Sequence, residues 1–174
     1  MEDDAPRLFT GRLELIAATP ELARAAATSN DALAELLEVE VPRGWPPELM
    51  ADHQNEWAAE LEKDPTLVGW QAWYVVQVTP GILVGSIGFM GKPDEDGTIE
   101  CGYSFVPKYQ RRGYATEAFG GLIDWAFSHD HVRRIRAHTL AHLSASIRVM
   151  EKNGLSHVGE GDEAGTLRFE LTRP

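Results

Sequence analysis

Apolar residues recur every three or four positions between residues 19 and 63, which is the spacing of one face of a helix. This pattern predicts helices over residues 20–28, 31–39 and 48–63. Thr19-Pro20-Glu21 is typical of a helix start, because threonine can cap free N–H groups, proline fits the first turn and glutamate suits the positive end. A run with three prolines and a glycine, residues 42–47, separates the second helix from the third.

Alternation of apolar and polar residues marks the predicted strands. A first strand is predicted over residues 8–17, before the helices. From Trp70 onward the alternation returns, and Pro80-Gly81 indicates an antiparallel turn between two of the strands. The later strands are predicted over residues 70–79, 82–91, 98–106, 134–140, 157–160 and 166–171.

Two further helices interrupt this second run of strands. Residues 113–128 carry apolar side chains at helical spacing, and residues 144–152 end at Asn153-Gly154, a frequent helix stop. The resulting order of elements predicts one α/β (α+β) domain over residues 1–174, with a mixed sheet flanked by helices.

Composition narrows the class of protein. The chain has 174 residues, of which 43% are hydrophobic and 25% charged, as in ordinary globular proteins. No apolar run approaches the ~20 residues that a membrane span needs. The acidic start, MEDDAPRLF, lacks the apolar core of a signal peptide, and the single cysteine, Cys101, excludes an internal disulfide framework. We therefore expect a cytoplasmic protein that does not enter a membrane.

The negative charge is unevenly distributed. The net charge is −11, which argues against a nucleic-acid surface. Residues 1–66 hold 15 acidic and 5 basic side chains, whereas residues 67–174 hold 12 acidic and 11 basic ones. Two interpretations stay open: solvated helix faces, or an acidic rim that attracts a cationic substrate.

The stretch from Gln110 to Ala115 lies between a predicted strand and a predicted helix. Such a junction exposes unpaired N–H groups at the positive end of the helix, where phosphates bind. Gly113 would let a ligand approach the backbone, and Arg111 and Arg112 would add charge-assisted contacts. The alternative is a glycine needed only for the turn, with the arginines in water.

This stretch, in its context, resembles a known family. Gln110-x-x-Gly113-x-Ala115, after "ECGYSFVP" and before "TEAF", is similar to the acetyl-CoA signature of the GNAT N-acetyltransferases. The run "SASIRVMEKNGLSHVGEG" resembles the last helix and strand of that family. The opening "LFTGRLELIAATPELA" resembles the branch that contains the ribosomal-protein N-terminal acetyltransferases.

The resemblance implies a fold, and it implies which part of the chain binds which substrate. The sheet would be mostly antiparallel, with about six to seven strands, and splayed at the strand before the Gln110 loop. Residues 19–63 would form the acceptor side, and residues 98–155 the half that binds acetyl-CoA. Acetyl-CoA would be the co-substrate, and no metal would be needed.

The resemblance also implies which residues hold acetyl-CoA. The N–H groups from about Arg111 to Thr116 would bind the pyrophosphate, and residues 102–106 would pair with the pantetheine arm. An N–H near Phe105 or Val106 would face the thioester oxygen. The residues predicted to bind the co-substrate are Phe105, Val106, Gln110, Arg111, Arg112, Gly113, Tyr114, Ala115 and Thr116.

An acetylated amine must first lose a proton, because lysine-type amines are mostly charged at pH 7. Glu100 is our candidate for the base, since it lies on the strand that leads to the thioester, between apolar Ile99 and Cys101. The alternative is an exposed carboxylate or one paired with an arginine. Tyr103 lies three positions further and should face the opposite side of the strand. We list it, with Trp45, as a substrate-binding candidate.

A hydroxyl on the last helix is the candidate proton donor for the departing thiolate. Ser146 matches a position whose hydroxyl can reach the sulfur in the ribosomal branch. Many family members carry a tyrosine four residues later and an asparagine three residues earlier, where this chain has Met150 and Leu143. Ser146 is equally typical of the first turn of any helix.

The expected activity is acetyl transfer to a primary amine, on a peptide N-terminus or a small cationic molecule, by direct attack. The alternative is a CoA-binding sensor or interaction module that has lost turnover. Trp45, in the proline-rich segment, would form a wall of the acceptor site. We expect a monomer or a homodimer without nucleic-acid or membrane partners. The histidines lack accompanying cysteine or acidic ligands at metal-site spacing, which disfavours a metal site.

Overall fold

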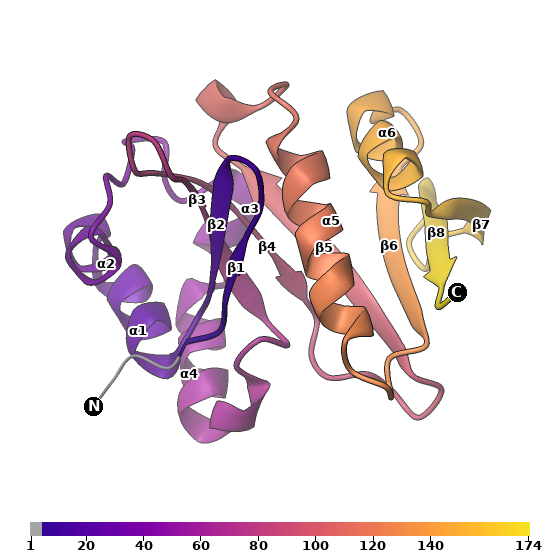
Figure 1. The fold of residues 1–174 in the computed structure, drawn as a ribbon, viewed down its shortest axis with the longest axis horizontal. Coiled ribbons are helices and arrows are strands. Elements are labelled where there is room, and N and C mark those ends of the chain that lie inside the picture. Colours follow the sequence, from indigo (N-terminus) through magenta and orange to yellow (C-terminus); the bar gives the residue numbers. More distant parts are fainter. Residues whose placement is uncertain (1–4) are drawn as a thin grey trace.

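The computed structural model describes residues 5–174, and within them the chain forms an eight-stranded sheet with helices on both faces (Figure 1). The strand order is β1-β2-β3-β4-β5-β6-β8-β7. All neighbouring strands are antiparallel except β5 and β6, which are parallel. The strands are β1 (Arg7–Phe9), β2 (Leu13–Ala17), β3 (Ala72–Gln77), β4 (Ile82–Phe89), β5 (Thr98–Phe105), β6 (Arg134–Leu140), β7 (Ser156–Glu160) and β8 (Thr166–Thr172). The mixed, mostly antiparallel α/β class is as predicted.

The predicted strand over residues 8–17 is wrong as a single strand, because it is a hairpin of β1 and β2. Leu8 lies opposite Leu15, and the Thr10 N–H donates to the Leu13 carbonyl at 2.9 Å to close the turn. The extra strand brings the sheet to eight instead of six to seven. The hairpin also sets Arg12 at the tip of the turn, beside the second half of the chain.

Helix α1 (Pro20–Thr28) is capped by Thr19, as predicted. Helix α2 (Asn30–Leu37) is capped by Ser29, which the sequence analysis did not single out. It ends before the predicted Val39, because Glu38 has a left-handed backbone. The predicted helix over residues 48–63 is instead two helices, α3 (Glu48–Ala51) and α4 (Gln54–Lys63). Neither proline nor glycine stands at the break, so the periodic pattern runs across it unmarked.

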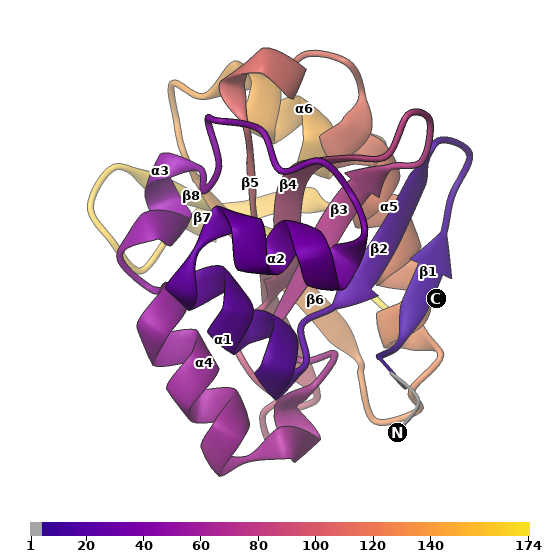
Figure 2. The same ribbon diagram turned by 90° about the vertical axis from the view of Figure 1, so that its left-hand side faces the viewer.

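The two faces of the sheet carry different helices. On one face, Trp73 of β3 meets Trp125 of α5 (Tyr114–Phe127) at 5.1 Å between ring centroids, and α6 (Ser144–Lys152) packs beside α5. On the other face, Tyr74 and residues of α1 and α4 line a small cavity of about 10 Å³. Figure 2 shows α1, α2 and α4 stacked together on their side of the molecule.

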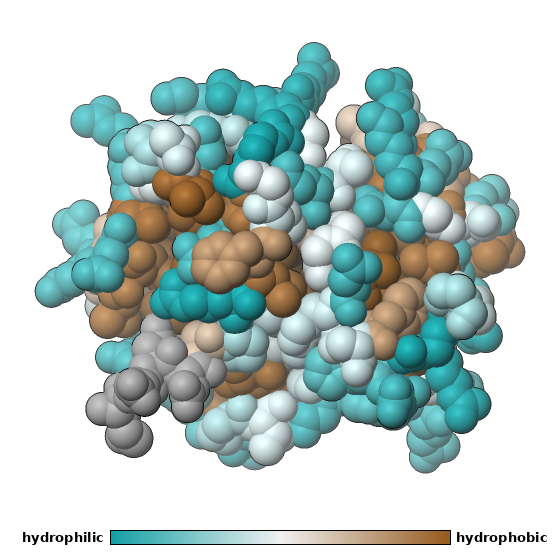
Figure 3. All heavy atoms as spheres, in the orientation of Figure 1, coloured by the Kyte–Doolittle hydropathy of each residue, from teal (hydrophilic) through white to brown (hydrophobic). Residues whose placement is uncertain are grey.

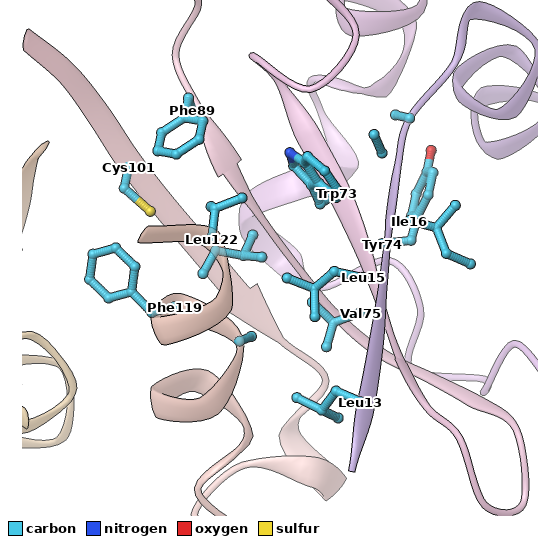
Figure 4. Close-up of a cluster of buried hydrophobic side chains, with 14 of the residues drawn as sticks. Leu13, Leu15, Ile16, Trp73, Tyr74, Val75, Phe89, Cys101, Phe119 and Leu122 are labelled. Atoms are coloured by element: carbon cyan, nitrogen blue, oxygen red, sulfur yellow. The ribbon is translucent and has the colours of Figure 1, made fainter. Parts of the chain in front are cut away.

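The main core lies between the sheet and α5. Figure 4 shows Leu13, Leu15 and Trp73 from the strands facing Phe119 and Leu122 from α5. All five side chains are fully buried. Burial of side chains of this size stabilises the fold by about 1.5–3 kcal/mol each. This packing fixes α5, and with it the loop that opens the helix.

The surface carries both hydrophilic and hydrophobic residues. Figure 3 shows hydrophilic side chains over most of the rim of one face, with hydrophobic surface between them. No helix among the described residues is long and apolar enough to cross a bilayer.

The sheet splays between β5 and β6. These strands pair from Thr98 opposite Arg134 to Cys101 opposite Ala137, and pairing stops there although both strands continue. Residues 102–105 of β5 therefore have no paired strand on the β6 side. The predicted splay at the strand before the Gln110 loop is confirmed, and it opens a gap in the middle of the sheet.

Candidate active site

Backbone groups of β5 line one side of the gap. In an antiparallel pair, alternate residues direct their N–H and C=O groups to the partner strand. The Val106 N–H donates to the Val84 carbonyl at 2.9 Å, so the even-numbered residues of β5 face β4. The N–H groups of Tyr103 and Phe105 consequently face the gap. They are free to bind an extended ligand as an added strand would.

This geometry sharpens the prediction of an N–H near Phe105 or Val106. The N–H of Val106 is already bonded to Val84, which leaves Phe105 and, in addition, Tyr103. Gln110 holds the end of the strand in place, because its Nε2 donates to the Phe105 carbonyl at 2.9 Å. Its amide therefore lies on the gap side of β5, at the Phe105 end of the strand.

The loop before α5 exposes the start of the helix. Gly113 is the N-cap with φ +82°, and no side chain caps the helix, so the N–H groups of Tyr114, Ala115 and Thr116 lack intrahelical partners. Arg111 also has a left-handed backbone, at φ +62°. Unpaired amides and the dipole of a 14-residue helix together make a site for an anion.

The cations near this loop differ in their contacts. The side chain of Arg112 lies over the Tyr109 ring at 5.4 Å, and both Arg111 and Arg112 are exposed. Arg12, which the sequence analysis did not single out, donates from Nη1 to the Arg112 carbonyl at 2.9 Å. It also lies 4.5 Å from the centre of the Tyr114 ring, which is itself buried. No local signal marks Arg12, because it acts from the distant hairpin.

Glu100 lies on the face of β5 opposite to α5, at the point where β5 and β6 part. Its Oε1 lies 2.7 Å from Nδ1 of His138, which is the residue of β6 just past the last paired position. The carboxylate side chain is 33% exposed. The structure shows Glu100 as a paired carboxylate, but its partner is a histidine and not the arginine considered in the sequence analysis.

Tyr103 and Ser146 meet on the other face. Their hydroxyl oxygens are 2.9 Å apart, and the Tyr103 ring packs 6.1 Å from Phe119. Burial raises the pKa of Tyr103, and the hydrogen bond with Ser146 partly offsets this. The side chain faces away from Glu100, as predicted. It packs with α5 and α6, and its role in substrate binding stays a prediction.

Trp45 lies inside the core. Its side chain is 3% exposed and packs 6.2 Å from the Tyr74 ring, while the Asn30 amide donates to its carbonyl at 2.9 Å. Its indole N–H is buried without a partner among the described residues. A role as a wall of an acceptor site stays a prediction.

Two histidines near the end of α5 pack against an aromatic ring. His129 and His131 lie 4.9 Å and 5.6 Å from Trp70. Within residues 5–174, no three histidine, cysteine or acidic side chains converge as metal ligands.

Comparison with known proteins identifies the family. The sequence model of the acetyltransferase (GNAT) domain matches residues 12–156, which include β2, the gap and the loop of Gly113. The chain belongs to the GNAT acetyltransferase family. The predicted enzyme class, an acetyl-CoA-dependent N-acetyltransferase, follows from this membership. YjdG of Bacillus subtilis, named as an uncharacterized N-acetyltransferase, is 32% identical over 147 residues, covering 84% of this chain and 88% of its own.

Solved structures share the fold at lower identity. RimL, a ribosomal L7/L12 alpha-N-protein acetyltransferase in complex with coenzyme A, has a TM-score of 0.68 and 17% identity, covering 96% of this chain and 98% of its own. RimJ of Mycobacterium smegmatis, in complex with a CoA disulfide, has a TM-score of 0.66 and 18% identity, covering 97% and 86%. The GNAT protein of Bacillus anthracis has a TM-score of 0.64 and 22% identity, covering 96% and 98%.

Proposed function

We propose that this GNAT enzyme transfers the acetyl group of acetyl-CoA to a primary amine, on a peptide N-terminus or a small cationic molecule. The observation that carries the proposal is the gap beyond Cys101, which has free strand N–H groups on its side and an uncapped helix start at its mouth. An extended chain with a pyrophosphate at one end fits both features. The CoA complexes of RimL and RimJ, which share the fold, support the same co-substrate.

The chain would hold acetyl-CoA mainly by its backbone. The free N–H groups of Tyr114, Ala115 and Thr116 would donate to the pyrophosphate, with Arg111 and Arg112 in reach of further phosphate oxygens. Gln110 would keep the Phe105 segment in place. The N–H groups of Tyr103 and Phe105 would then pair with the pantetheine arm and the thioester oxygen.

In the reaction the nitrogen loses two protons and the sulfur gains one. Glu100 would accept the first proton of the acceptor ammonium from the open face of β5. The amine nitrogen would then bond to the acetyl carbon as the carbon–sulfur bond breaks, and the acylated nitrogen would release its second proton to solvent. An N–H of β5 would stabilise the negative charge that develops on the carbonyl oxygen. Ser146, backed by the Tyr103 hydroxyl, would give a proton to the departing thiolate on the other face and would regain one from solvent.

The proposal of a cationic acceptor rests on the distribution of negative charge along the chain. Nearly all of the net negative charge lies in residues 1–66, which include the helices on the Glu100 face of the sheet. A negative potential there attracts a cationic amine and raises its local concentration. We infer that residues 19–63 form the acceptor side and residues 98–155 the acetyl-CoA side.

Turnover of acetyl-CoA, followed by thiol release over a panel of peptide N-termini and polyamines, tests this function. We expect at least one cationic amine to be acetylated. Glu100→Gln should lower kcat by about 100-fold or more with little change in CoA affinity.

One observation favours a second function. Met150 is buried where many relatives carry a tyrosine, so that hydroxyl is missing. Tight CoA binding with no turnover on any amine would indicate a CoA-binding sensor.

A further inference from the structure

We propose that His138 is the positioning residue that holds Glu100 in its reactive orientation. This inference rests on the proposed function, because it assigns a partner to the proposed base. Its basis is a contact between residues 38 positions apart, at the exact level where β5 and β6 separate.

The contacts of His138 define which ring nitrogen carries the proton. Nδ1 lies 2.7 Å from Oε1 of Glu100, and Nε2 lies 3.5 Å from Nε of Arg168, which can only donate. Nε2 therefore accepts a hydrogen bond, and the proton on Nδ1 makes the hydrogen bond to Oε1 of Glu100. Oε2 of Glu100 then stays available to accept a proton from the amine.

The β7–β8 loop holds the imidazole from the other side. A Cβ placed on Gly161 would stand 2.8 Å from Cδ2 of His138, so the loop backbone packs directly on the ring. Asp162 bonds to Arg168 at 2.5 Å and lies 3.8 Å from Nε2 of His138. The His138 side chain is only 15% exposed. The ring is thus confined by three elements, whereas the Glu100 side chain it holds is partly open to solvent.

The charges around His138 come from every neighbouring element. Glu100 faces it from β5, Arg168 from β8 and Asp162 from the β7–β8 loop. On β6 itself, Arg136 points to the same face but is bonded to Glu170 at 3.0 Å. The Nε–H of Arg168 is directed at Nε2, and the Nδ1–H on the other side of the ring is directed to Glu100.

Three variants test the positioning role. His138→Ala removes the hydrogen bond, and we expect kcat to fall about 10-fold to 100-fold with the KM for acetyl-CoA unchanged. His138→Asn keeps an N–H donor at the same distance from the backbone as Nδ1, so it should restore most of kcat. His142→Asn, at an exposed position just after β6, is the matched control and should behave as the wild type. An unchanged kcat in His138→Ala would overturn the proposal.

Nitrogen-15 NMR of the histidine side chains gives a readout that does not depend on turnover. We expect the Nδ1–H tautomer for His138 in the free wild-type protein and a changed Nδ1–H signal in Glu100→Gln. An Nε2–H tautomer would overturn the pairing. If the wild type acetylates no amine, the proposed function fails, while these spectra still decide whether His138 holds Glu100.

Discussion

Arg12 and Glu117 tie the first hairpin to the first turn of α5. The Nε of Arg12 donates to Oε1 of Glu117 at 2.8 Å, and the Arg12 backbone N–H donates to Oε2 at 2.9 Å. The Thr10 hydroxyl also donates to Oε2, at 2.5 Å. The helix start that we assign to pyrophosphate binding is therefore fixed by residues more than 100 positions earlier in the chain.

This connection predicts a pH-dependent contribution to stability. Burial raises the pKa of Glu117, but the hydrogen bonds from Thr10 and Arg12 outweigh it, so the net pKa is lowered. A carboxyl whose folded pKa lies below the unfolded value of about 4.3 stabilises the fold above that pH. The contribution is lost as pH falls through the folded pKa. Glu117→Gln should thus lower the free energy of unfolding by about 1 kcal/mol at pH 7 and by less below pH ~4.

Urea unfolding of the wild type and Glu117→Gln across this pH range measures the effect. Glu62→Gln is the control, because the Glu62–Arg24 pair is exposed on both sides and should matter little. A difference between wild type and Glu117→Gln that stays constant from pH 7 to pH 3 would contradict the prediction.

Gly113 should be essential for CoA binding. It has φ +82°, and a Cβ there would stand 3.3 Å from Nη2 of Arg12, at the mouth of the proposed pyrophosphate site. A valine at this position would add a branched side chain and strain of about 1–2 kcal/mol in the left-handed region. We expect Gly113→Val to weaken CoA binding at least 10-fold by calorimetry.

A matched glycine separates strain from loss of the site. Gly91 also has a left-handed backbone, at φ +104°, and nothing lies within 4 Å of its added Cβ. Gly91→Val should lower stability and leave CoA affinity unchanged. Equal affinities of the two variants would place the co-substrate elsewhere.

The sequence correctly predicted the helices and strands that are marked by a pattern within their own residues. The bounds of β6 and α6 match the predicted 134–140 and 144–152, since polar and apolar residues alternate over most of β6 and Asn153-Gly154 ends α6. The β1–β2 hairpin was missed because β1 has only three residues, too few to show an alternation of its own. The break between α3 and α4 carries no breaker residue.

The residues of the candidate site also fall into those that a local motif marks and those that it does not. Gly113 and Gln110 belong to one short motif and were predicted from it. Arg12 and His138 join the site only through tertiary contacts, across the hairpin in one case and across parallel strands in the other. Histidine spacing in the sequence says nothing about a carboxylate on a neighbouring strand, so His138 was considered only as a metal ligand and set aside.

If the Tyr103–Ser146 pair protonates the departing thiolate, removing either hydroxyl should lower kcat, and by different amounts. Ser146→Ala removes the α6 hydroxyl and should lower kcat about 10-fold, less than the usual effect of a general acid, because a thiolate is a good leaving group. Tyr103→Phe removes only the supporting hydroxyl and should cost less. Neither change should alter the KM for acetyl-CoA. Ser144→Ala, at the exposed first residue of α6, is the control. A wild-type kcat in Ser146→Ala would mean that the thiolate leaves without a donor.

Cys101 should be chemically silent in the folded protein. Burial raises the pKa of its thiol, and Figure 4 shows the sulfur directed into the core toward Phe119 and Leu122. Since the thiolate is the reactive form, we expect a disulfide reagent such as DTNB at pH 8 to leave native Cys101 unmodified during a turnover assay. In urea the same reagent should titrate one thiol per chain. Native labelling as fast as that of free cysteine would show that β5 separates from α5, which would also undermine a rigid gap beside Tyr103.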